Sequence, residues 1–309
     1  MVWMSDVSID YDSLVDTGNY IQQLKLYPYF DAAHYTLVCL SVRDDLGPNA
    51  IAFSRKHPFS LWMSCILMSF AGSFLSSFLL GEPIISPFKR HNDVILATIV
   101  WYFMFFSPFD LVYKLVKLSI FKIPLCMAKE VQRAYKISHG VKYAGKLYPE
   151  SYLVQVLVGM SKGAGSGVVK VLEQLVRGTW SPTNHEILKP SFTSKACLIA
   201  SIVFTLERNS MYVTAPHDLV HLCVVGFFIY FKLAQLLLRV ENALAPVENV
   251  ACAFLLGGVF DAFARAVGET KESMQKGKKL SEDELLEKER EKEVQRKRSQ
   301  QNGVDKKNN

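Results

Sequence analysis

Long apolar stretches separated by short polar connections dominate the first 245 residues of this 309-residue chain. Three of them carry almost no charge, and the first, of 24 residues, exceeds the ~20 residues that a helix needs to cross a lipid bilayer. These stretches are Pro58–Gly81, Val94–Phe109 and Leu219–Phe231, the last of which continues through Lys232 to Leu238. The pattern predicts an all-α membrane protein.

Four further stretches are apolar but carry polar or ionisable residues at helical spacing. They are Tyr29–Val42, Phe121–Gly145, Ser151–Val176 and Lys195–Tyr212. Beside uncharged spans, they are expected to form helices whose polar face lies toward a bundle interior or an aqueous cavity. The sequence therefore predicts seven membrane spans. A shorter apolar piece, Val250–Val267, contains Asp261 and Arg265 and is not counted as a span.

Charge divides the chain into a membrane body and a soluble tail. From Glu269 to Asn309, 22 of 41 residues are charged, against 42 of the preceding 268. A soluble two-domain enzyme is disfavoured, because ordinary soluble domains carry about 25% charged residues. We expect four parts: a lumenal N-terminal segment (1–24), a seven-helix domain (25–245), a short apolar segment (246–268) and a charged cytosolic tail (269–309).

Lysine and arginine in the connections predict the orientation in the membrane. About nine lie on one side of the predicted spans and four on the other, and positive residues favour the cytosolic side. The N-terminus is then lumenal and the tail cytosolic. The tail ends with Lys306-Lys307-Asn308-Asn309, a pattern typical of retrieval to the endoplasmic reticulum. The net charge of +6 is spread along the chain, which suggests anionic lipid headgroups rather than nucleic acid as partners.

Three short similarities between the two halves of the body indicate an internal repeat. The matched pairs are Pro58-Phe-Ser60 with Pro149-Glu-Ser151, Ala71-Gly72-Ser73 with Ala164-Gly165-Ser166, and Ala97–Trp101 with Ala200–Phe204. Their order predicts duplication of a three-helix unit, spans 1–3 and spans 4–6, followed by a seventh helix. Because three spans are an odd number, the second copy is inverted, as in many transporters and channels.

Glycines at matched positions of this repeat are candidates for the pathway. They are Gly72 in span 2 and Gly163, Gly165 and Gly167 in span 5. The glycine run lacks the spacing of a nucleotide-binding loop, and no strand precedes it. Two interpretations stay open: a small-residue surface on which helices pack, or an interruption and kink of the helix that lines a cavity.

Basic residues in span 4 point to an anionic ligand. Lys129, Arg133 and Lys136 fall on one face of a helix, at i, i+4 and i+7. Three cations at membrane depth need water or anionic partners, so a wet pathway or a lipid headgroup site is expected. The alternative is an interfacial helix whose charges reach the membrane surface. His217 and His221 have metal-ligand spacing but are interpreted as interfacial histidines, and no catalytic constellation is recognisable.

Four motifs, in order, resemble those of the trimeric intracellular cation channels (TRIC), in particular type B-like members. They are Leu79–Pro83, Val100–Asp110, Met127–Arg133, which contains Lys-Glu-Val-x-Arg, and Glu173–Leu188. The resemblance covers roughly residues 25 to 265 and leaves the tail out.

The resemblance implies a homotrimer with one pore in each subunit and no enzymatic activity. It implies potassium conduction across the membrane of the endoplasmic or sarcoplasmic reticulum, as a counter-ion flow during calcium release. It also implies phosphatidylinositol 4,5-bisphosphate bound by Lys129 and Arg133, with no nucleotide or metal cofactor. Lys136 lies outside the motif. A secondary transporter with an inverted repeat, or a lipid-handling membrane protein, is the alternative.

Overall fold

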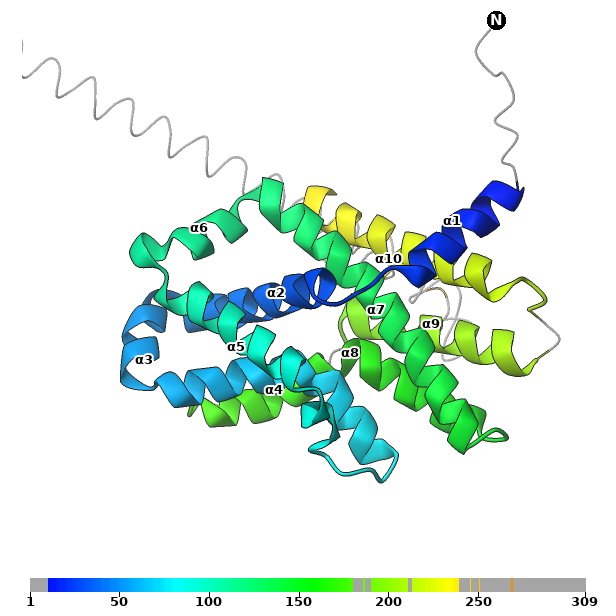
Figure 1. The fold of residues 1–309 in the computed structure, drawn as a ribbon, viewed down its shortest axis with the longest axis horizontal. Helices are drawn as coiled ribbons and strands as arrows, with labels where there is room; N and C mark the ends of the chain where they lie inside the picture. The colour runs from blue at the N-terminus through cyan, green and yellow to red at the C-terminus, as the bar shows by residue number, and fades with distance from the viewer. Residues whose placement is uncertain are drawn as a thin grey trace, which may run out of the picture. The chain divides into compact units, whose positions relative to one another are not determined.

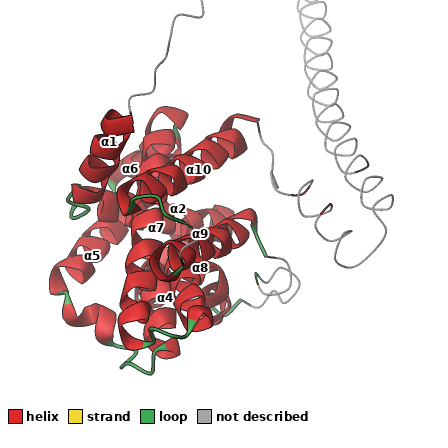
Figure 2. Ribbon diagram, turned by 90° about the vertical axis from the view of Figure 1, so that its right-hand side faces the viewer, coloured by secondary structure: helices red, strands yellow, loops and turns green. Residues whose placement is uncertain are grey.

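A computed structural model describes residues 11–179, 186, 190–210 and 213–238, together with the isolated residues 245, 250 and 268. Its regular secondary structure over these residues is entirely helical (Figure 2). The chain divides into two compact units, residues 1–242 and 243–309, and the first contains every helix from Tyr11 to Leu238. The predicted charged tail lies outside the described residues, as does most of the predicted apolar segment 250–267.

Seven helices of 16 or more residues lie within the described residues, one at each apolar stretch of the sequence. They are α2 (Tyr29–Leu46), α4 (Pro58–Leu79), α5 (His91–Phe106), α7 (Ser119–Leu147), α8 (Tyr152–Val176), α9 (Phe192–Asn209) and α10 (His217–Leu238). By length and composition alone, α4 and α10 qualify as membrane-crossing helices, and α5 qualifies if it counts as one span with the short helix that follows it.

Six shorter elements connect or flank these helices. One of them, α1 (Tyr11–Gln23), lies in the polar N-terminal segment, where the sequence did not predict a helix. It packs on the start of α10 (Figure 1), and Gly18 permits this contact, since a Cβ there would lie 2.5 Å from the carbonyl oxygen of Asp218. The others are η1 (Gly47–Asn49), α3 (Ala50–Lys56), η2 (Ser86–Lys89), η3 (Pro108–Asp110) and α6 (Leu111–Lys117).

The helices α4 and α8 meet backbone to backbone (Figures 1 and 2). A Cβ at Gly165 would lie 2.7 Å from the Cα of Gly72, and a Cβ at Gly72 would lie 2.6 Å from the carbonyl oxygen of Lys162. Both helices run without a break through their glycines. Of the two interpretations of these glycines, the structure supports a close helix–helix contact of the kind that small residues permit.

A buried arginine organises the bend between α5 and α6, which turn by 90°. The Arg43 guanidinium lies 2.9 Å from the carboxylate of Asp110 and donates to the carbonyl of Met104 at 2.5 Å. Phe109 and Asp110 have left-handed backbone angles, with φ of 53° and 56°, which cost non-glycine residues roughly 1–2 kcal/mol each. The ion pair holds this turn, and the helix predicted to reach residue 109 ends at Phe106 instead.

Substitution of Gly165 by alanine is expected to destabilise the protein by about 1–3 kcal/mol, because the added methyl group overpacks the contact with Gly72. Gly226→Ala in α10 is the matched control, since no atom lies within 4 Å of its added Cβ. There the better helix propensity of alanine should raise stability by about 0.5–1 kcal/mol. The thermal unfolding midpoints of the purified variants test this, and an equal response of both would contradict the backbone contact.

Candidate functional site

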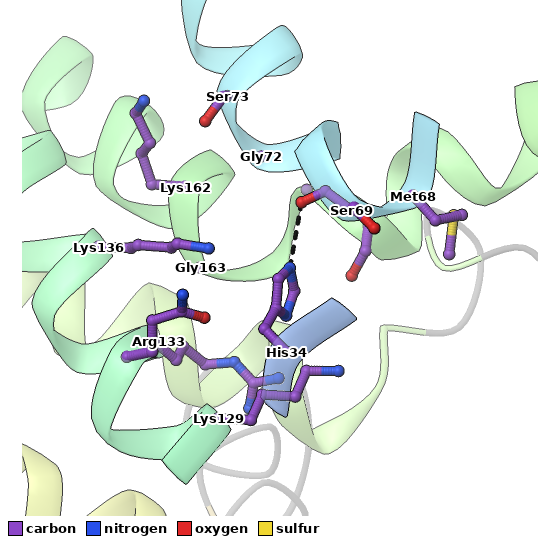
Figure 3. Close-up of a pocket in the computed structure, with 13 residues that line it drawn as sticks. His34, Met68, Ser69, Gly72, Ser73, Lys129, Arg133, Lys136, Lys162 and Gly163 are labelled. Atoms are coloured by element: carbon purple, nitrogen blue, oxygen red, sulfur yellow. Dashed lines mark hydrogen bonds between the residues drawn. The ribbon is translucent and has the colours of Figure 1, made fainter. Parts of the chain in front are cut away.

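A small polar cavity of about 40 Å³ lies where α2, α4, α7 and α8 meet (Figure 3). One water molecule needs roughly 10–15 Å³ of cavity volume. The cavity therefore has room for about three water molecules. Four cationic side chains dominate its lining, with histidine, glutamine, serine and glycine filling the gaps. The lining residues are His34, Met68, Ser69, Gly72, Ser73, Lys129, Gln132, Arg133, Lys136, Lys162, Gly163, Gly165 and Ser166.

The four cations come from two facing helices. Lys129, Arg133 and Lys136 follow one face of α7, as their spacing predicted, and Lys162 enters from α8 (Figure 3). Arg133 is paired with Glu130, one turn away on α7 and only 2% exposed. In the described part of the chain, no carboxylate lies within 4.0 Å of the amino group of any of the three lysines. The cavity therefore carries a net positive charge.

His34 gives the cavity an uncharged polar group. Its Nε2 lies 3.1 Å from the carbonyl oxygen of Ser69 (Figure 3). Because a carbonyl only accepts hydrogen bonds, Nε2 carries the proton of the neutral ring and Nδ1 is an acceptor. That Nδ1 is buried and has no hydrogen-bond partner in the described structure. An acceptor beside four cations suits a water molecule or another proton donor in the cavity.

Most of the predicted site residues come together here. Lys129 and Arg133 line the cavity with Gly72, Gly163 and Gly165, whereas Gly167 does not. The space beside Gly167 is taken by the side chain of Glu186, whose Cγ would lie 2.6 Å from an added Cβ.

Glu186 in turn connects α8 to the beginning of α9. Its carboxylate accepts hydrogen bonds from the backbone N–H of Ser191 at 2.8 Å and from the hydroxyl groups of Ser191 and Ser194 at 2.5 Å each. Burial raises the pKa of Glu186, but these hydrogen bonds outweigh burial and leave that pKa below its usual value. Gly167 thus belongs to a helix connection rather than to the cavity.

His34, Gln132 and Lys162 are site residues that were not predicted from the sequence. Lys162 carried a usable signal, because a lone lysine inside a long apolar helix faces protein or water rather than lipid. Gln132 is 2% exposed and donates to Asp31 of α2, which connects the two helices beside the cavity. Nothing in the sequence indicated that His34 faces the cavity, because its placement depends on how α2 is rotated against α4.

The two histidines of α10 lie at a different place. The ring of His217 contacts the carboxylate of Glu207 at 3.1 Å and the hydroxyl group of Ser138 at 3.3 Å, whereas His221 is 2% exposed. No cluster of three or more His, Cys, Asp or Glu side chains suited to a metal ion occurs within the described residues. His217 therefore takes part in helix packing through its contacts with Glu207 and Ser138.

The fold and this site define a helical membrane protein with a cationic internal cavity, and comparison with known proteins gives the family. A family model described as "TRIC channel" matches residues 47–239. The trimeric intracellular cation channel type 1B.2 of Caenorhabditis elegans is 66% identical over the full length of both chains. The type B channel of Danio rerio is 37% identical over 64% of this chain and 68% of its own.

Solved structures agree with these relatives. A trimeric intracellular cation channel from Caenorhabditis elegans, solved in the absence of Ca²⁺, is 72% identical, with a TM-score of 0.72 over 75% of this chain and all of its own. A structure described as a basis for activity of TRIC counter-ion channels in calcium release is 32% identical, with a TM-score of 0.69 over 73% of this chain and 99% of its own. The chain belongs to the TRIC channel family, and hence to the ion channels rather than the enzymes.

Glu130→Gln is expected to destabilise the protein by about 3 kcal/mol, because it removes the carboxylate partner of the Arg133 guanidinium, whose side chain is only 12% exposed. Glu150→Gln removes the same charge from an exposed position after α7 and should leave stability unchanged. Denaturation of both variants in the same detergent measures the difference. If the two variants unfold alike, the ion pair does not stabilise this region.

Proposed function

We propose that this protein is a potassium channel of the endoplasmic or sarcoplasmic reticulum that supplies counter-ion flow during calcium release. Membership of the TRIC channel family supports conduction of cations. The counter-ion role is supported by the solved structure that is 32% identical and described as a counter-ion channel in calcium release. The mechanism rests on one observation, the cavity lined by four cationic side chains between α2, α4, α7 and α8.

This cavity repels potassium unless an anion neutralises it. A single unit charge at about 4 Å contributes roughly 4 kcal/mol of repulsion at an effective dielectric constant near 20. Four cations with one carboxylate partner would therefore exclude a permeant cation. We propose that phosphatidylinositol 4,5-bisphosphate binds with its phosphate groups against Lys129 and Arg133. Its two phosphate monoesters carry about −3 to −4 charges together, enough to reverse the sign of the local potential.

Size adds a requirement to this proposal. A bisphosphorylated inositol ring is larger than the roughly three water molecules for which the cavity has room. Binding therefore needs the long side chains of Lys129 and Arg133 to swing toward the headgroup, or α7 and α8 to separate. Headgroup binding and widening of the pathway are then the same event. In this mechanism the lipid both supplies negative charge and opens the route for the ion.

We further propose that the seven long helices cross the membrane as two inverted three-helix units and a seventh helix. Gly72 and Gly165 occupy matched positions of the sequence repeat, and their backbones touch. Residues at equivalent positions of two inverted units meet where the pseudo-two-fold axis passes between them. Ser73 and Ser166, the next matched pair, both line the cavity. This arrangement supports a pathway built symmetrically from the second helix of each unit.

Lys129→Gln and Arg133→Gln are each expected to weaken phosphoinositide binding about tenfold, because each removes a charge-assisted hydrogen bond to phosphate. Single-channel recording of the reconstituted protein, with potassium on both sides and increasing phosphoinositide, measures the shift in lipid dependence. Lys146→Gln removes the same charge from the exposed last turn of α7 and should behave like the parent protein. Equal lipid dependence of all four proteins would contradict the proposed site. A silent bilayer from folded parent protein would contradict the channel itself.

The proposed assembly and orientation can be tested together. We expect a homotrimer, as the names of the relatives state for those proteins, so the purified protein should have a mass of three 34.9 kDa subunits after correction for detergent. An epitope at the C-terminus should be accessible to antibody in sealed reticulum vesicles, because the tail is proposed to be cytosolic. A lumenal, protected epitope would overturn the orientation, and a monomeric mass would overturn the trimer.

A further inference from the structure

A second, larger hollow lies at the bend between α5 and α6, apart from the cationic cavity. Its volume is about 400 Å³, and α3 forms its other wall; α3, the end of α5 and the start of α6 lie together at the left of Figure 1. Arg55 and Lys114 line it with Asp110 and with the apolar side chains of Ile51, Phe106 and Phe109. From this composition we infer that the hollow binds the headgroup of an anionic phospholipid.

The charge of the hollow is positive because its one lining carboxylate is already neutralised. Asp110 pairs at 2.9 Å with Arg43, whose side chain is 5% exposed and whose guanidinium lies 4.0 Å from the ring centre of Tyr113. Arg55 and Lys114 are exposed, and no carboxylate within the described residues lies in ion-pair range of either. Two cations on opposite walls therefore remain for an anion. A phosphate diester accepts charge-assisted hydrogen bonds from both residue types.

The backbone of the turn presents an apolar side chain at the rim. Phe109 and Asp110 both have left-handed backbone angles, and strained residues held by surrounding structure often mark binding sites. Phe109 is 90% exposed. Such exposure is unfavourable in water and favourable at the boundary between lipid headgroups and acyl chains, where amphipathic segments place their aromatic rings.

The direction of α6 supports the same depth. It leaves α5 at 90°, so it runs along the membrane surface if α5 crosses the bilayer. Leu111 and Leu115 are exposed on α6, at 53% and 39%, together with the cations Lys114 and Lys117. This mixture is typical of an amphipathic helix at the membrane interface. The phosphate would lie between Arg55 and Lys114, with the acyl chain along Ile51, Phe106 and Phe109.

An anionic lipid fits this hollow better than a soluble anion does, because an acyl chain can pack against the apolar lining residues and inorganic phosphate cannot. A zwitterionic lipid has the same acyl chains but no net negative charge for the two cations. The site shares no residue with the cavity that holds Lys129 and Arg133. It therefore goes beyond the proposed phosphoinositide site, and either site can fail without the other.

A fluorescent reporter in the hollow tests this inference. Phe109→Trp places an indole at the exposed rim, and the protein is reconstituted with brominated phosphatidylserine or brominated phosphatidylcholine at equal mole fraction. We expect the serine lipid to quench the added fluorescence about threefold more effectively, after subtraction of the signal from the protein that keeps Phe109. Arg55→Gln with Lys114→Gln should abolish this preference. An absent preference in the reporter protein would overturn the inference.

Two controls separate a site from general surface charge. Lys56→Gln with Lys117→Gln removes the same two charges from α3 and α6 at positions that do not line the hollow, and should keep the preference. If this pair loses the preference as fully as Arg55→Gln with Lys114→Gln, a diffuse surface potential explains it and the site is wrong. Native mass spectrometry of proteins that keep Phe109 shows whether the Phe109→Trp substitution itself changes lipid binding. There, retained phosphatidylserine should fall only when Arg55 and Lys114 are changed.

Discussion

The contact between α4 and α8 without intervening side chains is the constraint on which the cavity depends. Gly72 and Gly165 bring the two backbones together, and the adjacent Ser73 and Ser166 then face a shared space rather than separate surfaces. A larger residue at either glycine would push the helices apart and change the width of this space. The same close approach places Lys162 in the lining of the cavity together with the cations of α7, so helix packing also sets the charge of the cavity.

Arginine and lysine play different parts in this molecule. The buried arginines Arg43 and Arg177, like Arg133 beside the cavity, each have a carboxylate partner, Asp110, Glu173 and Glu130 respectively. The pair of Arg43 with Asp110 joins α2 to the bend after α5, whereas the other two pairs each lie along one helix; in all three, the planar guanidinium suits a fixed geometry. The three lysines of the cavity have no such partner within the described residues, and their flexible stems can follow a ligand. Arg43 and Arg177 therefore hold the fold with their carboxylates and the cavity lysines remain for binding, whereas Arg133 is both paired with Glu130 and proposed to bind phosphate.

The two proposed lipid sites would use membrane phosphate differently. At the cavity, phosphate would neutralise the positive charge that the packed helices leave without carboxylate partners. It would thereby alter ion passage directly. At the bend of α5, phosphate would sit beside an ion pair, Arg43 with Asp110, that is already complete. The first site would couple lipid to conduction, while the second would fix how α6 rests on the membrane surface. Both follow from cations placed where a bilayer supplies anions.

The sequence by itself determined the seven long helices and the charged face of α7, because apolar length and the spacing of Lys129, Arg133 and Lys136 are local properties of one segment. It also supported the family, through motifs that keep their order. Tertiary structure decided which residues meet: it brought His34 and Lys162 to the cavity, assigned Gly167 to Glu186 instead, and ended α5 at Phe106. The reason is physical, because helix rotation and the reach of a side chain from another helix depend on packing that no single segment encodes.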